Sequence, residues 1–136
     1  MKKQSLTLIL GCVGLLLSSC AVTKLEAGAE NVVVTDKTHM PSSCKALGNI
    51  FVNDTNGTSV TYTSHERLQK YQTGILKNKT FDLGGNVLVI TSHETTYTED
   101  HDVDTHILRG SAYSCTETTL QKIVPVAPSD IIHIDE

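Results

Sequence analysis

The chain has 136 residues, of which 39% are hydrophobic and 4% aromatic, and its formal net charge is −4. This length and apolar content correspond to one globular domain with a modest core. The acidic charge argues against binding to nucleic acid and against a polybasic surface for lipid headgroups, and it is compatible with cations or basic protein partners.

The leader, residues 1–19, has the pattern of a lipoprotein signal peptide. Two lysines are followed by an apolar run over 6–17 and then by Ser18, Ser19 and Cys20. The run is typical of a signal peptide and too short to span a membrane. We expect cleavage before Cys20 and acylation of this residue, which would anchor the protein by lipid. Loss of the two lysines would bring the charge to −6.

The residue after Cys20 is Ala21 rather than Asp, which in lipoproteins of bacteria with two membranes usually directs the protein to the outer membrane. We therefore expect a lipid-anchored outer-membrane protein with its domain in the periplasm or at the cell surface. The leader removes Cys12 and acylation uses Cys20, so two of the four cysteines remain. In an oxidising compartment we expect these to form a disulfide, Cys44 with Cys115. A reactive thiol is the alternative, although the sequence has no C-x-x-C motif.

After a short tether over 20–30, which we expect to be poorly ordered, two strands and a turn are predicted. The strands are predicted at 31–35 and 48–52, with a loop over 36–43 between them, and the turn is predicted at 54–58. The next pattern predicts a helix that begins near Thr63, because Thr63 and Glu66 have capping-box spacing. Apolar residues follow at intervals of three and four, at Leu68, Tyr71, Ile75, Leu76 and Leu83. The helix should end at Gly84-Gly85.

The strongest predicted strand follows at 86–91, an apolar and β-branched run that should be buried on both faces. Its hairpin partner is expected at 107–115 and a last edge strand at 122–126, because Pro125 excludes a central position. The predicted fold class is α+β, with a small antiparallel or mixed sheet of about four strands, one helix packed on it and one disulfide. This domain would span 31–126, with a C-terminal tail over 127–136.

One segment carries side chains that could bind a metal ion. It lies between the two hairpin strands, and imidazole and carboxylate groups there suit Zn, Ni or Cu. Charged hairpin loops are common, however, and the spacing matches no known ligand signature, so a solvated loop is the favoured interpretation. The candidate ligands are His93, His101, Asp102, Asp104 and His106.

The order of several short motifs resembles a family of small uncharacterised bacterial lipoproteins. These motifs are Cys44-x-x-Leu47-Gly48, a capped helix, Leu83-Gly84-Gly85-Asn86 running into 87–90, and Gly110-x-Ala112-Tyr113-x-Cys115. The helix-Gly-Asn-strand element is also similar to that of the outer-membrane sensor lipoprotein of the Rcs envelope-stress relay. That relative has two disulfides, whereas one can form here. The resemblance implies an α+β fold and the disulfide.

The sequence contains no G-x-S-x-G, no H-E-x-x-H and no glycine-rich phosphate loop, so it points to no catalytic residues and no resident cofactor. We therefore expect a non-catalytic lipoprotein that acts through contacts with envelope proteins, in sensing or assembly. The alternative is a periplasmic lipoprotein that binds divalent metal through 93–106.

Overall fold

The computed structural model describes residues 24–40, 42–55, 65–100, 103–127 and 130. The leader, Cys20, Thr63 and most of the C-terminal tail lie outside the described residues. Within these described ranges the elements are, in chain order, η1 (Ala29–Asn31), β1 (Val33–Asp36), η2 (Lys37–His39), β2 (Lys45–Thr55), α1 (His65–Asp82), β3 (Val87–Tyr97), β4 (Val103–Ser114) and α2 (Glu117–Leu120), where η marks a 3-10 helix.

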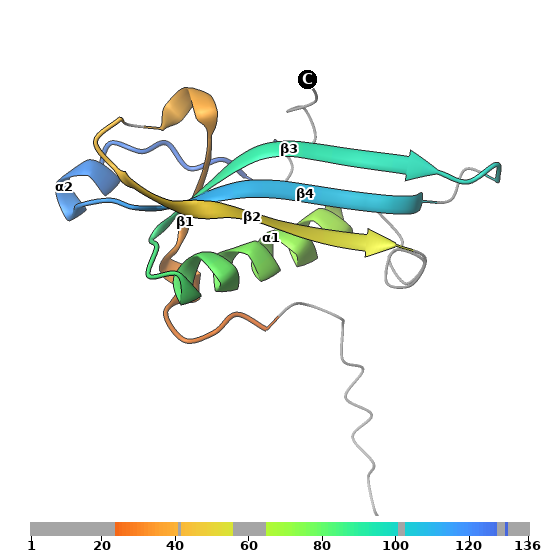
Figure 1. Ribbon diagram of the computed structural model, residues 1–136, viewed down its shortest axis with the longest axis horizontal. Helices are drawn as coiled ribbons and strands as arrows, with labels where there is room; N and C mark the ends of the chain where they lie inside the picture. The colour runs from red at the N-terminus through yellow and green to blue at the C-terminus, as the bar shows by residue number, and fades with distance from the viewer. Residues whose placement is uncertain (1–23, 41, 56–64, 101–102, 128–129, 131–136) are drawn as a thin grey trace, which may run out of the picture.

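The four strands form one mixed sheet in the order β1-β3-β4-β2 (Figure 1). β1 runs parallel to β3, and β4 pairs antiparallel with both β3 and β2. The helix α1 lies along one face of the sheet, with the segment that precedes β1 on its far side. This arrangement confirms the predicted α+β fold with a mixed sheet and one main helix.

The start of β3 is buried on both faces. On the α1 side, Leu88 and Ile90 pack with Leu76 of the helix. On the other side, Val87 and Val89 pack with Cys115 and Ile123, which belong to the C-terminal end of the chain. We expected a strand over 86–91 that is buried on both faces, and this is confirmed for 87–90, an unbroken run of four apolar side chains, whereas residues 86 and 91 are only partly buried.

The buried side of α1 is more polar than the predicted apolar pattern. Leu68 and Leu76 are fully buried, but Tyr71 and Ile75 are only partly buried and Leu83 is exposed beyond the helix end. The remaining buried positions hold polar side chains: Gln69, Gln72, Thr73 and Thr80. The predicted face was wrong in this respect because Leu68 and Leu76 lie about two turns apart. The positions between them on the same side of the helix, Gln69, Gln72 and Thr73, therefore face the sheet whatever their chemistry.

The hairpin of β3 and β4 is longer than predicted. We expected a loop over 93–106, whereas β3 continues to Tyr97 and β4 begins at Val103. The polar residues 91–97 are held in the strand by pairing with β4 rather than by their own apolar pattern. A β-bulge between Ile90 and Ser92 shifts the pairing register, and His93 comes to lie opposite Leu108. The hairpin-loop interpretation was therefore wrong for both ends of this segment.

The segments at the two ends of the domain also differ from expectation. The tether over 20–30 was expected to be poorly ordered, but its described part docks on α1, where Asn78 hydrogen-bonds to Lys24 O (3.1 Å) and Glu26 N (3.0 Å). The stretch 122–126 was expected to be a strand, and it forms none. It instead follows the outer edge of β1, with Val126 N bonded to Val34 O at 2.9 Å.

Candidate functional site

Two histidines meet inside the domain, between the sheet and α1. His93 comes from β3 and His106 from β4, and the bulge after Ile90 turns His93 toward the helix side of the sheet. Their rings lie 4.4 Å apart between centroids, and the two Nε2 atoms are 2.6 Å apart. His106 is fully buried and His93 is 8% exposed. A contact of this length between ring nitrogens is an N–H···N hydrogen bond.

Gln72 of α1 determines which nitrogen carries the proton. Its Nε2 donates to the backbone oxygen of His106 at 2.9 Å, so its Oε1 is the atom facing His106 Nδ1. A carbonyl oxygen only accepts, and His106 Nδ1 is therefore the donor. In the neutral pair, His106 Nε2 must then accept, and His93 Nε2 donates to it. The hydrogen-bond network thus assigns one tautomer to each ring.

Further polar groups surround the pair. Thr95 Oγ1 lies 3.2 Å from His93 Nε2. One turn before Gln72, the amide of Gln69 is fully buried, and neither its nitrogen nor its oxygen has a hydrogen-bond partner among the described residues. A buried amide without partners carries a desolvation cost. The polar layer between α1 and the sheet is therefore only partly satisfied by hydrogen bonds.

The structure brings together two of the five predicted metal ligands. His93 and His106 are in contact, while His101 and Asp102 lie outside the described residues, and Asp104 is described only as part of β4. Among the described residues, no group of three His, Cys, Asp or Glu side chains converges on one point. Sequence reasoning missed Gln72, because a glutamine on a predicted helix gives no signal that it will face a histidine 34 positions away.

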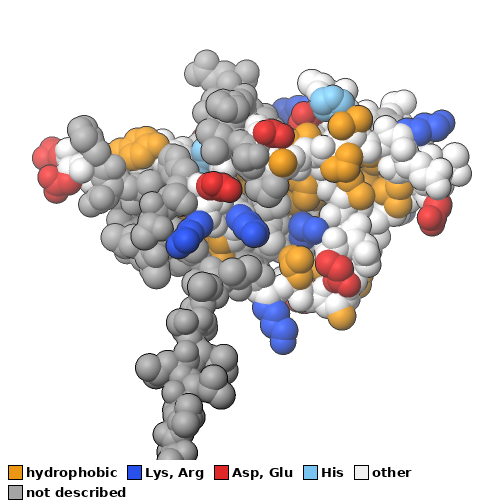
Figure 2. Space-filling model, turned by 180° about the vertical axis from the view of Figure 1, so that it is seen from behind, with side chains coloured by type: hydrophobic (Ala, Val, Ile, Leu, Met, Phe, Trp, Pro, Cys, Tyr) orange, Lys and Arg blue, Asp and Glu red, His pale blue; other side chains and the backbone are white. Residues whose placement is uncertain are grey.

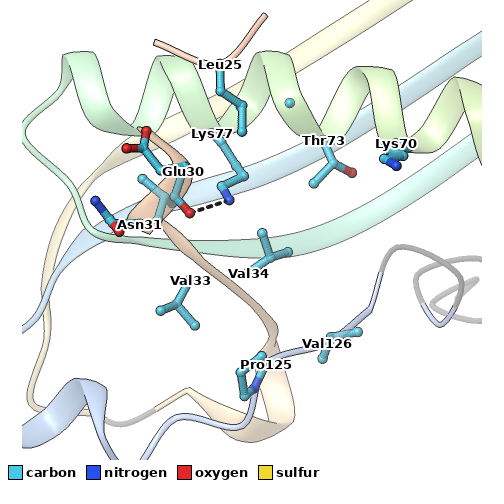
Figure 3. Close-up of a pocket in the computed structure, with 12 residues that line it drawn as sticks. Leu25, Glu30, Asn31, Val33, Val34, Lys70, Thr73, Lys77, Pro125 and Val126 are labelled. Atoms are coloured by element: carbon cyan, nitrogen blue, oxygen red, sulfur yellow. Dashed lines mark hydrogen bonds between the residues drawn. The ribbon is translucent and has the colours of Figure 1, made fainter. Parts of the chain in front are cut away.

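A cavity of about 430 Å³ lies between α1, β1 and the two end segments. Its walls are mostly apolar, with Leu25, Val34 and Val126 among them, and Lys70 and Lys77 also line it. On the face seen from behind in Figure 2, Lys and Arg side chains gather across the middle of the molecule. The close-up in Figure 3 shows Lys77 reaching toward the segment before β1, where its Nζ donates to Glu30 O at 3.0 Å. Burial lowers the pKa of Lys77, and the Glu30 carboxylate opposes this shift.

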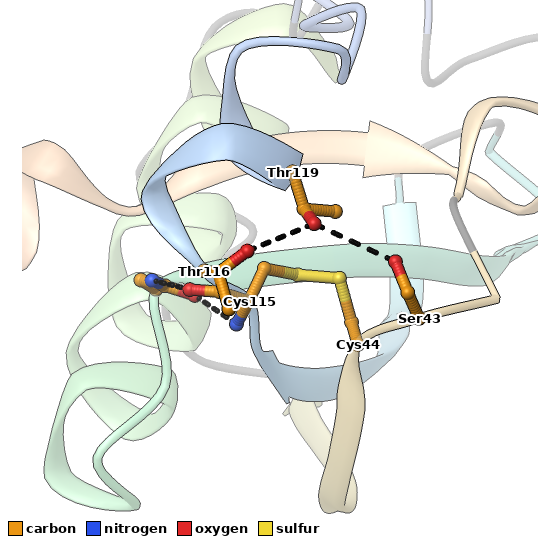
Figure 4. The surroundings of a disulfide bond; sticks show 6 residues. Ser43, Cys44, Cys115, Thr116 and Thr119 are labelled. Atoms are coloured by element: carbon orange, nitrogen blue, oxygen red, sulfur yellow. Dashed lines mark hydrogen bonds between the residues drawn. A yellow bond between two sulfur atoms is a disulfide. The ribbon is translucent and has the colours of Figure 1, made fainter.

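The disulfide joins the start of β2 to the end of β4, as predicted (Figure 4). The Cα atoms of Cys44 and Cys115 are 4.5 Å apart. The backbone of Cys115 is fixed by Asn86, whose side chain accepts from Cys115 N and donates to Cys115 O, both at 2.8 Å. Nearby, Thr119 Oγ1 lies 3.0 Å from Thr116 Oγ1 and 3.5 Å from Ser43 Oγ. The bond therefore closes the end of the sheet opposite the hairpin tip.

β2 forms one edge of the sheet, and within the described residues no further strand pairs with its outer side. The strand has 11 residues, and Phe51 in its middle is 59% exposed. Lys79 of α1 covers part of this edge, since its Nζ donates to Phe51 O at 2.8 Å and lies 5.8 Å from the Phe51 ring centroid. The carbonyl and amide of one strand residue point the same way, so Phe51 presents both to the outside.

A family model of a domain of unknown function, DUF4156, matches residues 23–115. The chain belongs to the DUF4156 family. The DUF4156 region contains all four strands, α1, both buried histidines and both disulfide cysteines, so these features lie within the family domain. Pro125 and Val126 of the cavity wall lie beyond it. Comparisons with curated proteins and with solved structures gave no match. In the part of this DUF4156 protein that is described, no helix has the length and apolar character needed to cross a membrane.

Proposed function

We propose that this DUF4156 protein is a lipid-anchored lipoprotein of the bacterial outer membrane, and that its domain acts through protein contacts, in envelope sensing or assembly, rather than by catalysis. The observation that carries the proposal is the order of a basic start, a short apolar run and Ser-Ser-Cys ending at Cys20. The Cys44–Cys115 disulfide supports an oxidising compartment such as the periplasm.

The outer edge of β2 supports action through protein contacts. Exposed edge strands bind extended segments of partner proteins by adding a strand to the sheet. β2 is long, and its exposed Phe51 would supply an apolar anchor beside the backbone groups of the edge. The ammonium group of Lys79 already donates a hydrogen bond to one of these groups, the carbonyl of Phe51. A partner strand would have to displace the Lys79 side chain.

The lipid anchor is tested by mass spectrometry of the N-terminal peptide from the outer-membrane fraction. We expect a peptide that begins at Cys20 and carries the added mass of acyl chains. Cys20→Ser should keep the leader and carry no acyl mass, whereas Cys12→Ser is the matched control and should be processed normally. A chain that begins at Met1, or a mature chain without acyl groups, would contradict the proposal.

The protein contact is tested in cells with a photo-crosslinking amino acid at position 51. Position 124 is the control, because Val124 is similarly exposed but lies at the β1 edge (59% and 54% exposed). We expect a discrete envelope protein to crosslink at 51 and not at 124, and Asn53→Pro to weaken the adduct by disturbing the edge. Recovery of the same abundant envelope proteins from both positions would contradict a specific contact at β2.

A second candidate function, divalent-metal binding, is favoured by the contact between His93 and His106. Two imidazole nitrogens that already face each other could share a Zn, Ni or Cu ion in place of the proton. We expect calorimetric titration of the detergent-solubilised chain to give saturable binding that His93→Ala or His106→Ala abolishes. His39→Ala is the control, since His39 lies on the surface and bonds to Asp36. Binding that is absent, or unchanged in the pair variants, would exclude this candidate.

A further inference from the structure

The chain approaches the domain along the outer side of α1, which faces away from the sheet. Lys24 O and Glu26 N both bond to Asn78, and Lys77 Nζ bonds to Glu30 O. Further along, the ring of Phe81 packs against Gly28, where an added Cβ would lie 2.7 Å from it. The segment 24–31 is therefore fixed on α1, as Figure 1 shows, and the chain reaches the domain at this face.

The distance from this face to the proposed anchor is short. Only three residues separate Cys20 from Lys24, and a fully extended chain of this length spans at most about 14 Å between the two Cα atoms. The acyl chains on Cys20 would begin at the boundary between headgroups and hydrocarbon. Lys24 must then lie within or just above the headgroup layer, which brings the outer side of α1 near the membrane surface.

The charges of the domain are unevenly distributed along the chain. Segment 24–31 and α1 hold five of the nine Lys and Arg residues in 20–136, namely Lys24, Arg67, Lys70, Lys77 and Lys79, but only four of its fifteen Asp and Glu residues. With five basic and four acidic residues, segment 24–31 and α1 carry a net charge of +1, whereas the remainder of 20–136, with four basic and eleven acidic residues, carries −7. Lys79, one of the five basic residues, reaches the β2 edge, so the other four are those near the outer side of α1. Arg67 and Lys70 are exposed and lie on the side of α1 opposite Leu68 and Leu76.

Exposed apolar side chains lie at the C-terminal end of α1. Phe81, on the outer side of α1, is 39% exposed despite its contact with Gly28, and Leu83 just beyond the helix is 47% exposed. Aromatic and aliphatic side chains beside Lys and Arg form the combination that interfacial helices use at a membrane surface. Charge and apolar exposure therefore point to the same kind of partner.

We propose that this anchor face, formed by Lys24, Arg67, Lys70, Lys77 and Phe81, lies against the headgroups of a bilayer that contains anionic phospholipids. The proposal rests on the lipid anchor at Cys20. The acidic remainder of the domain is repelled by the same surface, so the domain takes one orientation. β2 and its Phe51 lie at the sheet edge, clear of the outer side of α1, and stay accessible to a protein partner.

The test uses the fact that the chain contains no tryptophan. Phe81→Trp and Tyr97→Trp each introduce one emitter, the first in the anchor face and the second at the exposed end of β3 (Tyr97 is 56% exposed). Each full-length acylated variant is reconstituted into vesicles containing brominated phosphatidylglycerol or, separately, brominated phosphatidylcholine alone. In the anionic vesicles we expect bromine to quench the fluorescence of the tryptophan at position 81 severalfold more than that of the tryptophan at position 97. This difference in quenching should shrink in neutral vesicles or at high salt.

Charge-reversed variants sharpen the result. Arg67→Glu with Lys70→Glu should remove the preference for anionic vesicles, whereas Lys37→Glu with Lys122→Glu, away from α1, should preserve it. Leu83→Trp provides a second reporter in case a larger ring at position 81 disturbs its contact with Gly28. Equal quenching at positions 81, 83 and 97 in an acylated chain would overturn the orientation alone. A chain without acyl groups on Cys20 would overturn both the anchor and the orientation.

Discussion

His93 and His106 share a hydrogen bond between their Nε2 atoms, 2.6 Å apart, across two strands of one hairpin. Gln72 of the facing helix bonds to both the ring and the backbone of His106. Because the amide of Gln72 has a fixed polarity, the pair is not free to choose its tautomers. A side chain on α1 therefore determines the protonation pattern of two rings in the sheet.

We predict that in the metal-free protein at neutral pH His106 is the Nδ1–H tautomer and His93 the Nε2–H tautomer. Two-bond nitrogen–proton correlation spectra of histidine-labelled protein distinguish the two forms for each ring. Gln72→Glu keeps an acceptor opposite His106 Nδ1 and should preserve the assignment of His106. If His106 is found as the Nε2–H form, the assignment made from Gln72 is wrong.

The two buried glutamines of α1 should respond in opposite ways to replacement by leucine. Gln72→Leu leaves His106 Nδ1–H and the His106 carbonyl without their partner, and we expect a loss of about 1–3 kcal/mol in the free energy of unfolding. Gln69→Leu removes a buried amide that makes no hydrogen bond with the described residues, so it should be neutral or stabilising. Urea unfolding measures both variants. Equal losses would show that the two amides have equivalent surroundings.

The disulfide should contribute a large part of the stability. Cys44 and Cys115 are 71 positions apart, and in the chain-entropy model a loop of this size stabilises the fold by about 4 kcal/mol. We expect the Cys44→Ala, Cys115→Ala double variant to lose a comparable amount in urea unfolding. Reductant should destabilise the parent protein and leave the double variant unchanged. Alkylation of both thiols in denatured, unreduced protein would contradict the disulfide.

The Asp36 carboxylate should make the free energy of unfolding depend on pH in the acidic range. Its Oδ1 accepts from Thr38 Oγ1 (2.6 Å), Thr38 N (2.8 Å) and His39 N (3.1 Å) at the start of η2. The Thr38 hydroxyl and the other hydrogen bonds hold the pKa of Asp36 below its ordinary value of 3.8, although burial opposes the shift. Because the folded pKa is lowered, the stabilisation is complete above about pH 4 and is lost as the pH falls through the folded value.

We therefore expect Asp36→Asn, which keeps an acceptor oxygen but loses the charge, to lower the free energy of unfolding slightly at pH 7, and the difference from the parent to shrink below pH 4. Unfolding curves at several pH values measure this. Asp82→Asn is the control, because a carboxylate at the C-terminal end of α1 is not favoured by the helix dipole, and its removal should cost nothing at pH 7. A difference that persists unchanged to pH 2 would exclude this role for the carboxylate.

The parts of the fold that sequence reasoning predicted are those encoded by neighbouring residues. The run 87–90 is apolar and β-branched, and Gly84 has the positive φ of 79° that a helix end requires. The second half of β3 is polar, and its strand structure depends on pairing with β4, which no local pattern shows. The bulge after Ile90 also changes which residues face the helix. Strict alternation from Ile90 would place Ser92 on the helix side of the sheet, whereas the bulge places His93 on that side.

The candidate site was predicted only in part for the same reason. The sequence identified His93 and His106 as members of a segment rich in charged side chains and histidines, but their contact depends on the register of two strands. Gln72 bonds to His106 from 34 positions away in the chain. The docking of 24–31 likewise depends on Asn78, which is more than 50 positions along the chain. Contacts between segments so far apart in the chain leave no signal in composition or spacing.

Gly28 provides a direct measure of how firmly the segment before β1 is docked on α1. Its φ of 102° is unfavourable for other residues, and an added Cβ would lie 2.7 Å from the Phe81 ring. Gly84 has a comparable φ of 79° but nothing within 4 Å of its added Cβ. Gly84→Ala should therefore lower the free energy of unfolding by about 1–2 kcal/mol through the backbone alone. Gly28→Ala should carry a similar backbone cost and lose a further amount of about 1–3 kcal/mol through overpacking against Phe81.

A double-mutant cycle separates these two terms. In the Phe81→Ala background the ring is gone, so Gly28→Ala should cost no more than Gly84→Ala, and the coupling between positions 28 and 81 should exceed about 0.5 kcal/mol. Urea unfolding of the four variants gives this coupling. If Gly28→Ala and Phe81→Ala are additive, the segment does not pack against the end of α1. The short path from Cys20 to the anchor face would then lose its structural basis, because the chain would reach the domain at a point free to move.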